Sequence, residues 1–218
     1  MNSLGVIDDR DDMRETCVRA IDAVLEGRLG LIDHAPLEHL DGYPSWVIEQ
    51  QIVALVVDER LSEQAGPGRT HVTYAGHDVI QILRQANPLL PLFVLTQYPD
   101  DIGLMEKRGA VEDVLSRRGF LHEPKLFVDR MVRAGQRYST ERTKAVAELG
   151  TLAARIASGK ANESDTMRAL ALQIELNLNI PISEVGQRAA WIDALQRKVD
   201  EISSVRKALQ IKLARAKK

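Results

Sequence analysis

Residues 52–61 read IVALVVDERL, an unbroken aliphatic run that ends at the acidic residue Asp58. A short run rich in Val and Leu, without Gly or Pro, is typical of a buried strand. Such a strand delivers the Asp58 carboxylate to its carboxyl end, where an isolated charge is costly unless polar groups or a cation surround it. The partners of Asp58 must therefore come from other parts of the chain.

The first 138 residues alternate between strand-like and helix-like segments about five times. Strands are expected in the apolar segments 4–8, 30–34, 52–58, 91–97 and 111–116. Helices are expected between and after them, at 11–26, 46–51, 77–86, 101–109 and 124–137. Strands joined by helical crossovers form a parallel sheet with helices on both faces. The sequence therefore predicts an α/β fold for this part of the chain.

Acidic side chains follow two of the predicted strands. Asp8 and Asp9 come at the end of the first strand, and Asp58 comes at the end of the third. The carboxyl ends of parallel strands are where such sheets bind ligands. Three carboxylates at one edge repel each other unless a cation is present, and Mg²⁺ prefers oxygen ligands. We therefore predict a Mg²⁺ site formed by Asp8, Asp9 and Asp58.

A Mg²⁺ site beside an exposed carboxylate suits phosphoryl transfer, because the metal neutralises the phosphoryl oxygens while the carboxylate attacks phosphorus. We therefore expect Asp58 to be open to water. Thr96, which ends the fourth strand, is expected to hydrogen-bond a phosphoryl oxygen, and Arg117 or Arg118 to bind another. The simpler alternative is that Asp8 and Asp9 only cap the helix that follows them.

The last 80 residues read differently from the first 138. Residues 1–138 hold 15 basic and 22 acidic residues, whereas 139–218 hold 14 and 9. An amphipathic helix is expected at 140–157, and Ser164 is a candidate N-cap for a second helix. From about residue 185, apolar residues recur at heptad-like spacing, which is typical of a coiled coil. The asymmetry indicates two parts with separate roles.

Composition excludes several classes of protein. The single cysteine, Cys17, cannot form an internal disulfide framework, fits a reducing cytosol and lies on the apolar side of the first predicted helix. No signal-peptide pattern opens the chain, and no apolar run approaches the roughly 18–20 residues of a membrane span. We therefore expect a cytoplasmic protein without membrane contact.

Taken in order, these segments resemble the receiver domain of two-component response regulators over roughly residues 3–137. GVIDD at 5–9 resembles the family's paired acids, VVDE at 56–59 its phosphoacceptor segment, and VLT at 94–96 its strand ending in Thr or Ser. GHDVIQILR resembles a family helix that begins with Gly and ends in Arg, and GAVEDVLSRRGF resembles the segment around the family's invariant Lys, with Arg117 nearest that position.

The resemblance implies a flavodoxin-like (CheY-like) five-stranded parallel sheet with flanking helices. It also implies that Asp58 accepts a phosphoryl group from a histidine kinase or phosphotransfer protein, with Mg²⁺ held by Asp8 and Asp9 together with Asp58. Thr96 and Arg117 would contact the phosphoryl oxygens. Hydrolysis of the acyl phosphate is only a by-product in that family, so the resemblance implies a signalling protein rather than an enzyme.

The chain departs from the family pattern near the proposed site. Arg117 stands nearest the place of the invariant Lys, and Val114 and Leu115 stand where an aromatic residue is expected. The family's Pro soon after the acceptor Asp is missing, and residues 60–76 form an insertion instead. A phosphorylation-independent pseudo-receiver that acts as a protein interaction scaffold therefore stays open. An Asp-nucleophile hydrolase would place a second acid where Arg60 stands.

The predicted organisation is thus a receiver-like domain at 1–138 and a helical output or dimerisation region at 139–218, with a coiled coil from about 185. The helices are expected to form a homodimer or to pass the signal to a partner. The tail after Glu201 holds six basic residues and no acid. A DNA-binding regulator is therefore a further alternative, although the polar face of a helix explains the tail more simply.

Overall fold

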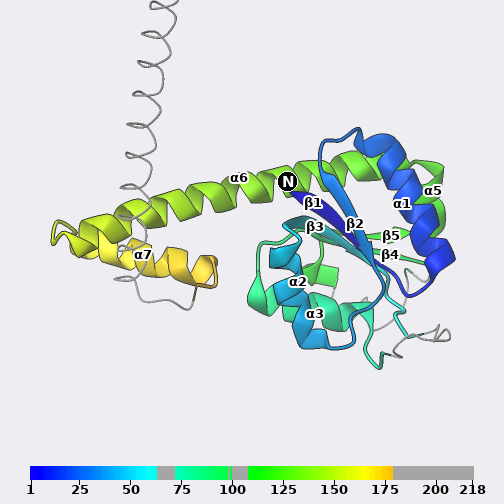
Figure 1. The fold of residues 1–218 in the computed structure, drawn as a ribbon, viewed down its shortest axis with the longest axis horizontal. Helices are drawn as coiled ribbons and strands as arrows, with labels where there is room; N and C mark the ends of the chain where they lie inside the picture. Colours follow the sequence, from blue (N-terminus) through cyan, green and yellow to red (C-terminus); the bar gives the residue numbers. More distant parts are fainter. Residues whose placement is uncertain (63–71, 98, 100–107, 179–218) are drawn as a thin grey trace, which may run out of the picture. The chain divides into compact units, whose positions relative to one another are not determined.

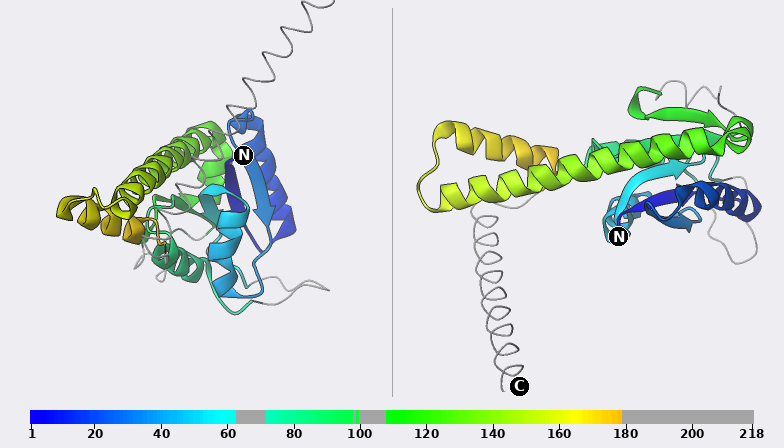
Figure 2. Two further views of the ribbon diagram at one scale, coloured as in Figure 1. Left: turned by 60° about the vertical axis from the view of Figure 1, so that its left-hand side comes forward. Right: turned by 90° about the horizontal axis from the view of Figure 1, so that it is seen from above.

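The computed structural model describes residues 1–62, 72–97, 99 and 108–178. The chain divides into two compact units, Met1–Arg142 (unit 1) and Thr143–Lys218 (unit 2). Unit 1 contains five parallel strands in one sheet, in the order β2-β1-β3-β4-β5 (Figures 1 and 2). The strands are β1 (Ser3–Ile7), β2 (Gly30–His34), β3 (Ile52–Val57), β4 (Leu92–Thr96) and β5 (Asp113–Ser116).

Helices cover both faces of this sheet. In chain order they are α1 (Asp11–Leu25), η1 (Leu40–Gly42), α2 (Tyr43–Glu49), α3 (Gly76–Ala86), η2 (Arg108–Ala110), α5 (Arg117–His122) and α6 (Pro124–Ala157). Figure 1 shows α1 and the first part of α6 on one side of the sheet and α2 with α3 on the other. The predicted α/β fold with a parallel sheet is therefore confirmed.

The core of unit 1 is mostly aliphatic, with a few buried aromatic side chains such as Tyr43, Phe93 and Phe120. Every residue of β1, β3 and β4 is buried, because side chains on both faces of a central strand meet helices. Gly135 lets α6 approach β3 closely, since a Cβ at this position would lie 3.0 Å from Val53 Cγ2. Cys17 is 1% exposed and belongs to this core, as expected.

The strand order places the candidate site. The chain moves from β1 outward to β2, and then crosses back to place β3 on the other side of β1. Crevices open at such a switch point, outside the carboxyl ends of the strands. The backbone of Asp58 pairs directly with the end of β1, since its N–H donates to the Ile7 carbonyl oxygen at 2.9 Å. The acids that follow β1 and β3 therefore become neighbours.

Several expected elements differ from those observed. The helix expected at 46–51 begins at Tyr43, with Pro44 in its first turn, a position that proline favours. The helices expected at 124–137 and 140–157 are one continuous helix, α6. Residues 138–140 contain neither Gly nor Pro, so nothing local ends it. The short helix α5 was not expected. The helix expected at 101–109 lies mostly outside the described residues.

Unit 2 contains the last part of α6, which continues into this unit, and α7 (Glu163–Glu175). Its apolar core consists of Ala145, Leu149, Leu152, Ala169, Leu172 and Leu176. Arg168 also binds both oxygens of Glu148 at 2.8 Å. The expected coiled coil from residue 185 and the basic tail after Glu201 lie outside the described residues. None of the helices in the described part of the chain has the length and apolarity that a bilayer crossing requires.

Asn162, rather than the expected Ser164, caps α7. The Asn162 side-chain oxygen accepts a hydrogen bond from the Asp165 N–H at 2.8 Å. The Asp165 carboxylate accepts one in return from the Asn162 N–H at 3.0 Å. This reciprocal arrangement satisfies two donors at the first turn. The helix consequently begins two residues earlier than an N-cap at Ser164 would indicate.

Candidate functional site

Three buried carboxylates meet at the carboxyl edge of the sheet. Asp8 and Asp9 follow β1 and are each 3% exposed, and Asp58 follows β3 and is 7% exposed. One side-chain oxygen from each residue lies within 4.8 Å of those from the other two. An oxygen set of this kind suits a hard divalent cation. The convergence that the sequence predicts for these residues is therefore present.

Arg117 lies among these acids. Its Nη1 donates to Asp8 Oδ2 at 2.7 Å, and its Nη2 lies 3.1 Å from Asp58 Oδ2. Arg117 is 5% exposed, and its Nη1 is also 3.9 Å from the sulfur of Cys17. One guanidinium thus bridges the acids that follow two adjacent strands, which its planar fork of donors permits. The same burial raises the pKa of the Cys17 thiol to about 11.

The other oxygens of the bridged carboxylates bind the backbone. Asp8 Oδ1 accepts a hydrogen bond from the Arg10 N–H at 2.9 Å. Asp58 Oδ1 accepts one from the Glu59 N–H, also at 2.9 Å. Each carboxylate therefore contacts a main-chain amide through one oxygen and Arg117 through the other. These bonds fix the orientation of both side chains at the edge of the sheet.

The expectation that Asp58 is open to water is wrong for this conformation. Asp58 is 7% exposed, because the Arg117 side chain lies against its outer oxygen. Burial is the largest influence on the carboxyl group and raises the pKa of Asp58 to about 7. The negative charges of Asp8 and Asp9 act in the same direction, and Arg117 opposes them. Arg117 does not outweigh burial, since its charge is shared with Asp8.

Thr96 and Arg118 are the other two residues that the sequence offers as contacts for phosphoryl oxygens. Thr96 ends β4 at the same sheet edge, is fully buried, and pairs in register with Ser116 at the end of β5. Arg118 is exposed, whereas Arg117 is the arginine that enters the site. The Ser116 hydroxyl sets the start of α5, since it accepts a hydrogen bond from the Gly119 N–H at 3.1 Å.

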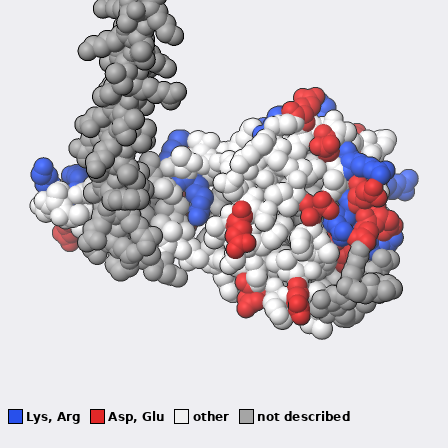
Figure 3. Space-filling view, in the orientation of Figure 1, with Lys and Arg blue, Asp and Glu red and all other residues white. Residues whose placement is uncertain are grey.

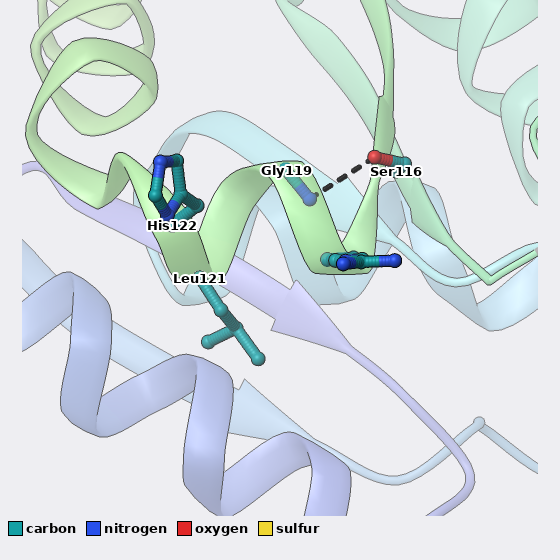
Figure 4. Close-up of a pocket in the computed structure, with 5 residues that line it drawn as sticks. Ser116, Gly119, Leu121 and His122 are labelled. Atoms are coloured by element: carbon teal, nitrogen blue, oxygen red, sulfur yellow. Dashed lines mark hydrogen bonds between the residues drawn. The ribbon is translucent and has the colours of Figure 1, made fainter.

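Arg118 instead lines a surface pocket beside α5. The pocket is formed by Ser116, Arg118, Gly119, Leu121 and His122. Figure 4 shows the Ser116–Gly119 hydrogen bond at its wall and the side chains of Leu121 and His122 extending from α5. None of the acids of the sheet edge lines this pocket. It is therefore a feature separate from the acidic site.

Two further charged residues support the site and were not expected from the sequence. Arg14 donates to the Asp8 carbonyl oxygen at 2.7 Å and to Asp33 at 3.0 Å, which holds the chain after β1 in place. Glu59 is 3% exposed and pairs with His77, the second residue of α3. No spacing pattern links Glu59 to His77, because 18 residues separate them.

A hydrogen bond joins the residues on the two sides of the insertion that follows Asp58. The Gly76 N–H donates to the Glu59 carbonyl oxygen at 2.8 Å. A Cβ at Gly76 would lie 2.2 Å from the Asp58 carbonyl oxygen and 2.9 Å from Glu59 Cα. Only glycine permits this approach without a shift of the backbone that carries Asp58. The first residue of α3 therefore packs directly against the site.

The surface near the site carries both signs of charge. Figure 3 shows basic and acidic side chains side by side along the edge of unit 1 where α1 lies. The ion pairs on this helix include Arg10 with Asp12, Arg14 with Asp11, and Arg19 with Glu15. The charges in these pairs neutralise each other. This edge therefore does not resemble the basic surface that binds nucleic acid.

The chain is similar in structure to several solved proteins, although the sequence identities are low. No protein-family model matches the chain, and no curated protein matches its sequence. A DNA-binding response regulator of the LuxR family from Staphylococcus aureus has a TM-score of 0.44 and 15% identity, over 62% of this chain and 99% of that chain. The RcsB response regulator of Salmonella typhimurium has a TM-score of 0.46 and 11% identity, over 87% and 98%.

A third solved structure is the signal receiver domain of a putative Luxo repressor protein from Vibrio parahaemolyticus. Its TM-score is 0.48 and its identity 10%, over 64% of this chain and 95% of that chain. The fold class of unit 1 follows from its own topology, since parallel strands in the order β2-β1-β3-β4-β5 with helices on both faces are the flavodoxin-like arrangement. The resemblance to receiver domains that the sequence predicts is therefore confirmed for the fold.

Proposed function

We propose that unit 1 is a response-regulator-like signalling module in which Asp58 accepts a phosphoryl group. The observation that supports this most directly is the convergence of Asp8, Asp9, Asp58 and Arg117 at one edge of the sheet. The three carboxylates supply the oxygen ligands that Mg²⁺ prefers. Arg117 supplies donors suited to a phosphoryl oxygen.

In the proposed reaction, a carboxylate oxygen of Asp58 attacks the phosphorus of a phosphohistidine on a histidine kinase or phosphotransfer protein. The new O–P bond forms as the N–P bond breaks, and the histidine nitrogen keeps the electron pair, so the product is an aspartyl phosphate. Mg²⁺ bound by Asp8, Asp9 and Asp58 would neutralise charge on the phosphoryl oxygens. Arg117 would leave the Asp58 carboxylate and contact a phosphoryl oxygen, as would the Thr96 hydroxyl.

The role proposed for the helical region is to carry the signal to a partner or a second copy. On α7 the side chains of Met167, Leu170 and Ile174 are 63%, 43% and 79% exposed. Their spacing of three and four residues places them on one face of the helix. An exposed apolar face of this kind favours association with another helix. A homodimer through unit 2 is therefore part of the proposal.

A phosphoryl mimic tests the acceptor role. Full-length protein is mixed with Mg²⁺ and beryllofluoride, which binds aspartate carboxylates in place of a phosphoryl group, and the melting temperature is measured. We expect a rise of about 5 °C or more when both components are present, since saturating ligand stabilises the state that binds it. The variant Asp58→Asn is the matched control and should not respond to beryllofluoride.

The second candidate function is a pseudo-receiver that acts as an interaction scaffold without phosphorylation. The burial of Asp58 behind Arg117 favours it, because the cation that the acids need is already part of the chain. In that case Mg²⁺ and beryllofluoride leave the melting temperature of both wild type and Asp58→Asn unchanged. The same experiment therefore separates the two candidates.

A further inference from the structure

The position of Arg117 limits what else the acids can bind. Its two terminal nitrogens contact the Oδ2 atoms of Asp8 and Asp58, at 2.7 Å and 3.1 Å. The remaining Oδ1 atoms of the same two carboxylates accept main-chain N–H groups at 2.9 Å. Both oxygens of both carboxylates are therefore engaged in this conformation. A metal ion that takes the Oδ2 atoms as ligands must replace the guanidinium.

The guanidinium is easier to displace than the backbone amides. The amides of Arg10 and Glu59 belong to the chain immediately after β1 and β3, so they move only if the backbone moves. Arg117, by contrast, reaches the acids through a long side chain from the first residue of α5. Its Nε is buried and has no hydrogen-bond partner among the described residues. Withdrawal of Arg117 would free that N–H to find a partner elsewhere.

Electrostatics makes the two cations alternatives rather than companions. Three carboxylates lie within 4.8 Å of one another and need positive charge between them. Arg117 supplies one unit of charge there, and Mg²⁺ would supply two. At such short range, two cations bound to the same Oδ2 atoms repel each other strongly. Occupation of these oxygens by one cation therefore excludes the other.

We propose that Arg117 is a built-in counter-ion that competes with a divalent cation for Asp8 and Asp58. This proposal rests on the metal site proposed above and adds a regulatory step to it. While Arg117 bridges the acids, the site is closed and Asp58 is covered. Binding of Mg²⁺ releases the guanidinium, which uncovers Asp58 and frees the donors of Arg117 for a phosphoryl oxygen. The Mg²⁺ concentration therefore sets the fraction of open sites.

A comparison of two neighbouring arginines tests the competition. Full-length wild type, Arg117→Met and Arg118→Met are freed of metal with a chelator and titrated with MgCl₂, and binding is followed by calorimetry and by the melting temperature. Both substitutions remove one positive charge, but Arg118 is exposed and does not enter the site. We expect Arg117→Met to bind Mg²⁺ about tenfold more tightly than wild type or Arg118→Met. Equal or weaker binding by Arg117→Met would overturn the proposal.

Arg117→Lys is measured in parallel, because Arg117→Met leaves the acids without a counter-ion and could impair folding at low Mg²⁺. A single ammonium cannot bridge Asp8 and Asp58 as the two terminal nitrogens of Arg117 do. Its Mg²⁺ affinity should therefore lie between those of wild type and Arg117→Met. An affinity of Arg117→Lys that equals wild type would contradict the proposal.

The competition and the acceptor function can fail separately. Tighter Mg²⁺ binding by Arg117→Met without any response to beryllofluoride would support the competition and reject phosphoryl acceptance. A response of wild type to beryllofluoride with unchanged Mg²⁺ affinity in Arg117→Met would support acceptance and reject the competition. Absence of Mg²⁺ binding in every variant would reject the metal site and the competition together.

Discussion

At the scale of single residues, the site combines groups that stabilise the fold with groups that destabilise it. Gly76 and the backbone amides after β1 and β3 fix the chain, whereas the buried carboxylates introduce repulsion that Arg117 offsets. Asp58 is the clearest case. Its carboxyl group is buried between Arg117 and the other acids, and the pKa of Asp58 rises to about 7. The folded chain therefore favours the protonated form of Asp58 more than the unfolded chain does.

This pKa predicts how stability changes with pH in the absence of metal. Because the pKa of Asp58 is higher in the folded chain than in the unfolded chain, the folded state binds a proton more tightly. The resulting stabilisation is fully present below the unfolded pKa near 4 and is lost as the pH rises through about 7. We expect wild type to gain stability relative to Asp58→Asn as the pH falls from about 8 to about 5, by up to about 1.4 kcal/mol per pH unit.

The measurement is urea unfolding of both proteins at several pH values in the presence of a chelator. Asparagine does not titrate in this range and keeps the size of the side chain. Parallel stability curves for wild type and Asp58→Asn would show that Asp58 does not titrate between these pH values in the folded chain.

At the scale of elements, helix ends are set by side chains that bond the backbone. The Ser116 hydroxyl caps α5 and so directs Arg117 into the site, while the adjacent Arg118 stays outside. In unit 2, Asn162 and Asp165 form reciprocal bonds at the start of α7. The candidate Ser164 instead lies within the first turn, where its hydroxyl is not needed as a cap. Substitution of Asn162 and of Ser164 in turn would measure how much each side chain stabilises α7.

We expect Asn162→Ala to destabilise α7 by about 1 kcal/mol, because the Asp165 N–H loses its acceptor at the first turn. Ser164→Ala is the matched control two residues away and should have little effect. Hydrogen exchange of the first-turn amides of α7 measures the change locally in the full chain. Faster exchange in Ser164→Ala than in Asn162→Ala would contradict the assignment of the cap.

At the scale of the whole molecule, the chain joins an α/β unit to a helical unit through one continuous helix. α6 runs from Pro124 to Ala157 and contributes residues to both units. Receiver-like chemistry in unit 1 would reach a partner through the helices of unit 2. The apolar face of α7 is the surface of the described residues on which we base this part of the proposal.

We therefore expect a charge on this face to weaken self-association. The double variant Met167→Lys with Ile174→Lys should shift the full-length protein from dimer toward monomer, because two lysines would be desolvated in an apolar interface. Sedimentation velocity over a range of concentrations measures the shift. Glu175→Lys, at an exposed position about 100° around the helix from Ile174, is the control and should remain dimeric. A wild type that is monomeric at every concentration would reject the dimer.

The amino-acid sequence was sufficient to predict the alternation of strands and helices in unit 1 and the acids at the strand ends. Aliphatic periodicity and turn residues are local signals, and parallel strands necessarily bring their carboxyl ends to one edge. Only packing in the folded chain determines that α6 is continuous, that Arg117 bridges Asp8 and Asp58, and that Asp58 is covered. These features depend on packing between residues far apart in the chain, such as Gly135 against Val53 and Arg117 against Asp8. No local pattern encodes such contacts, because their energy exists only once the sheet has formed.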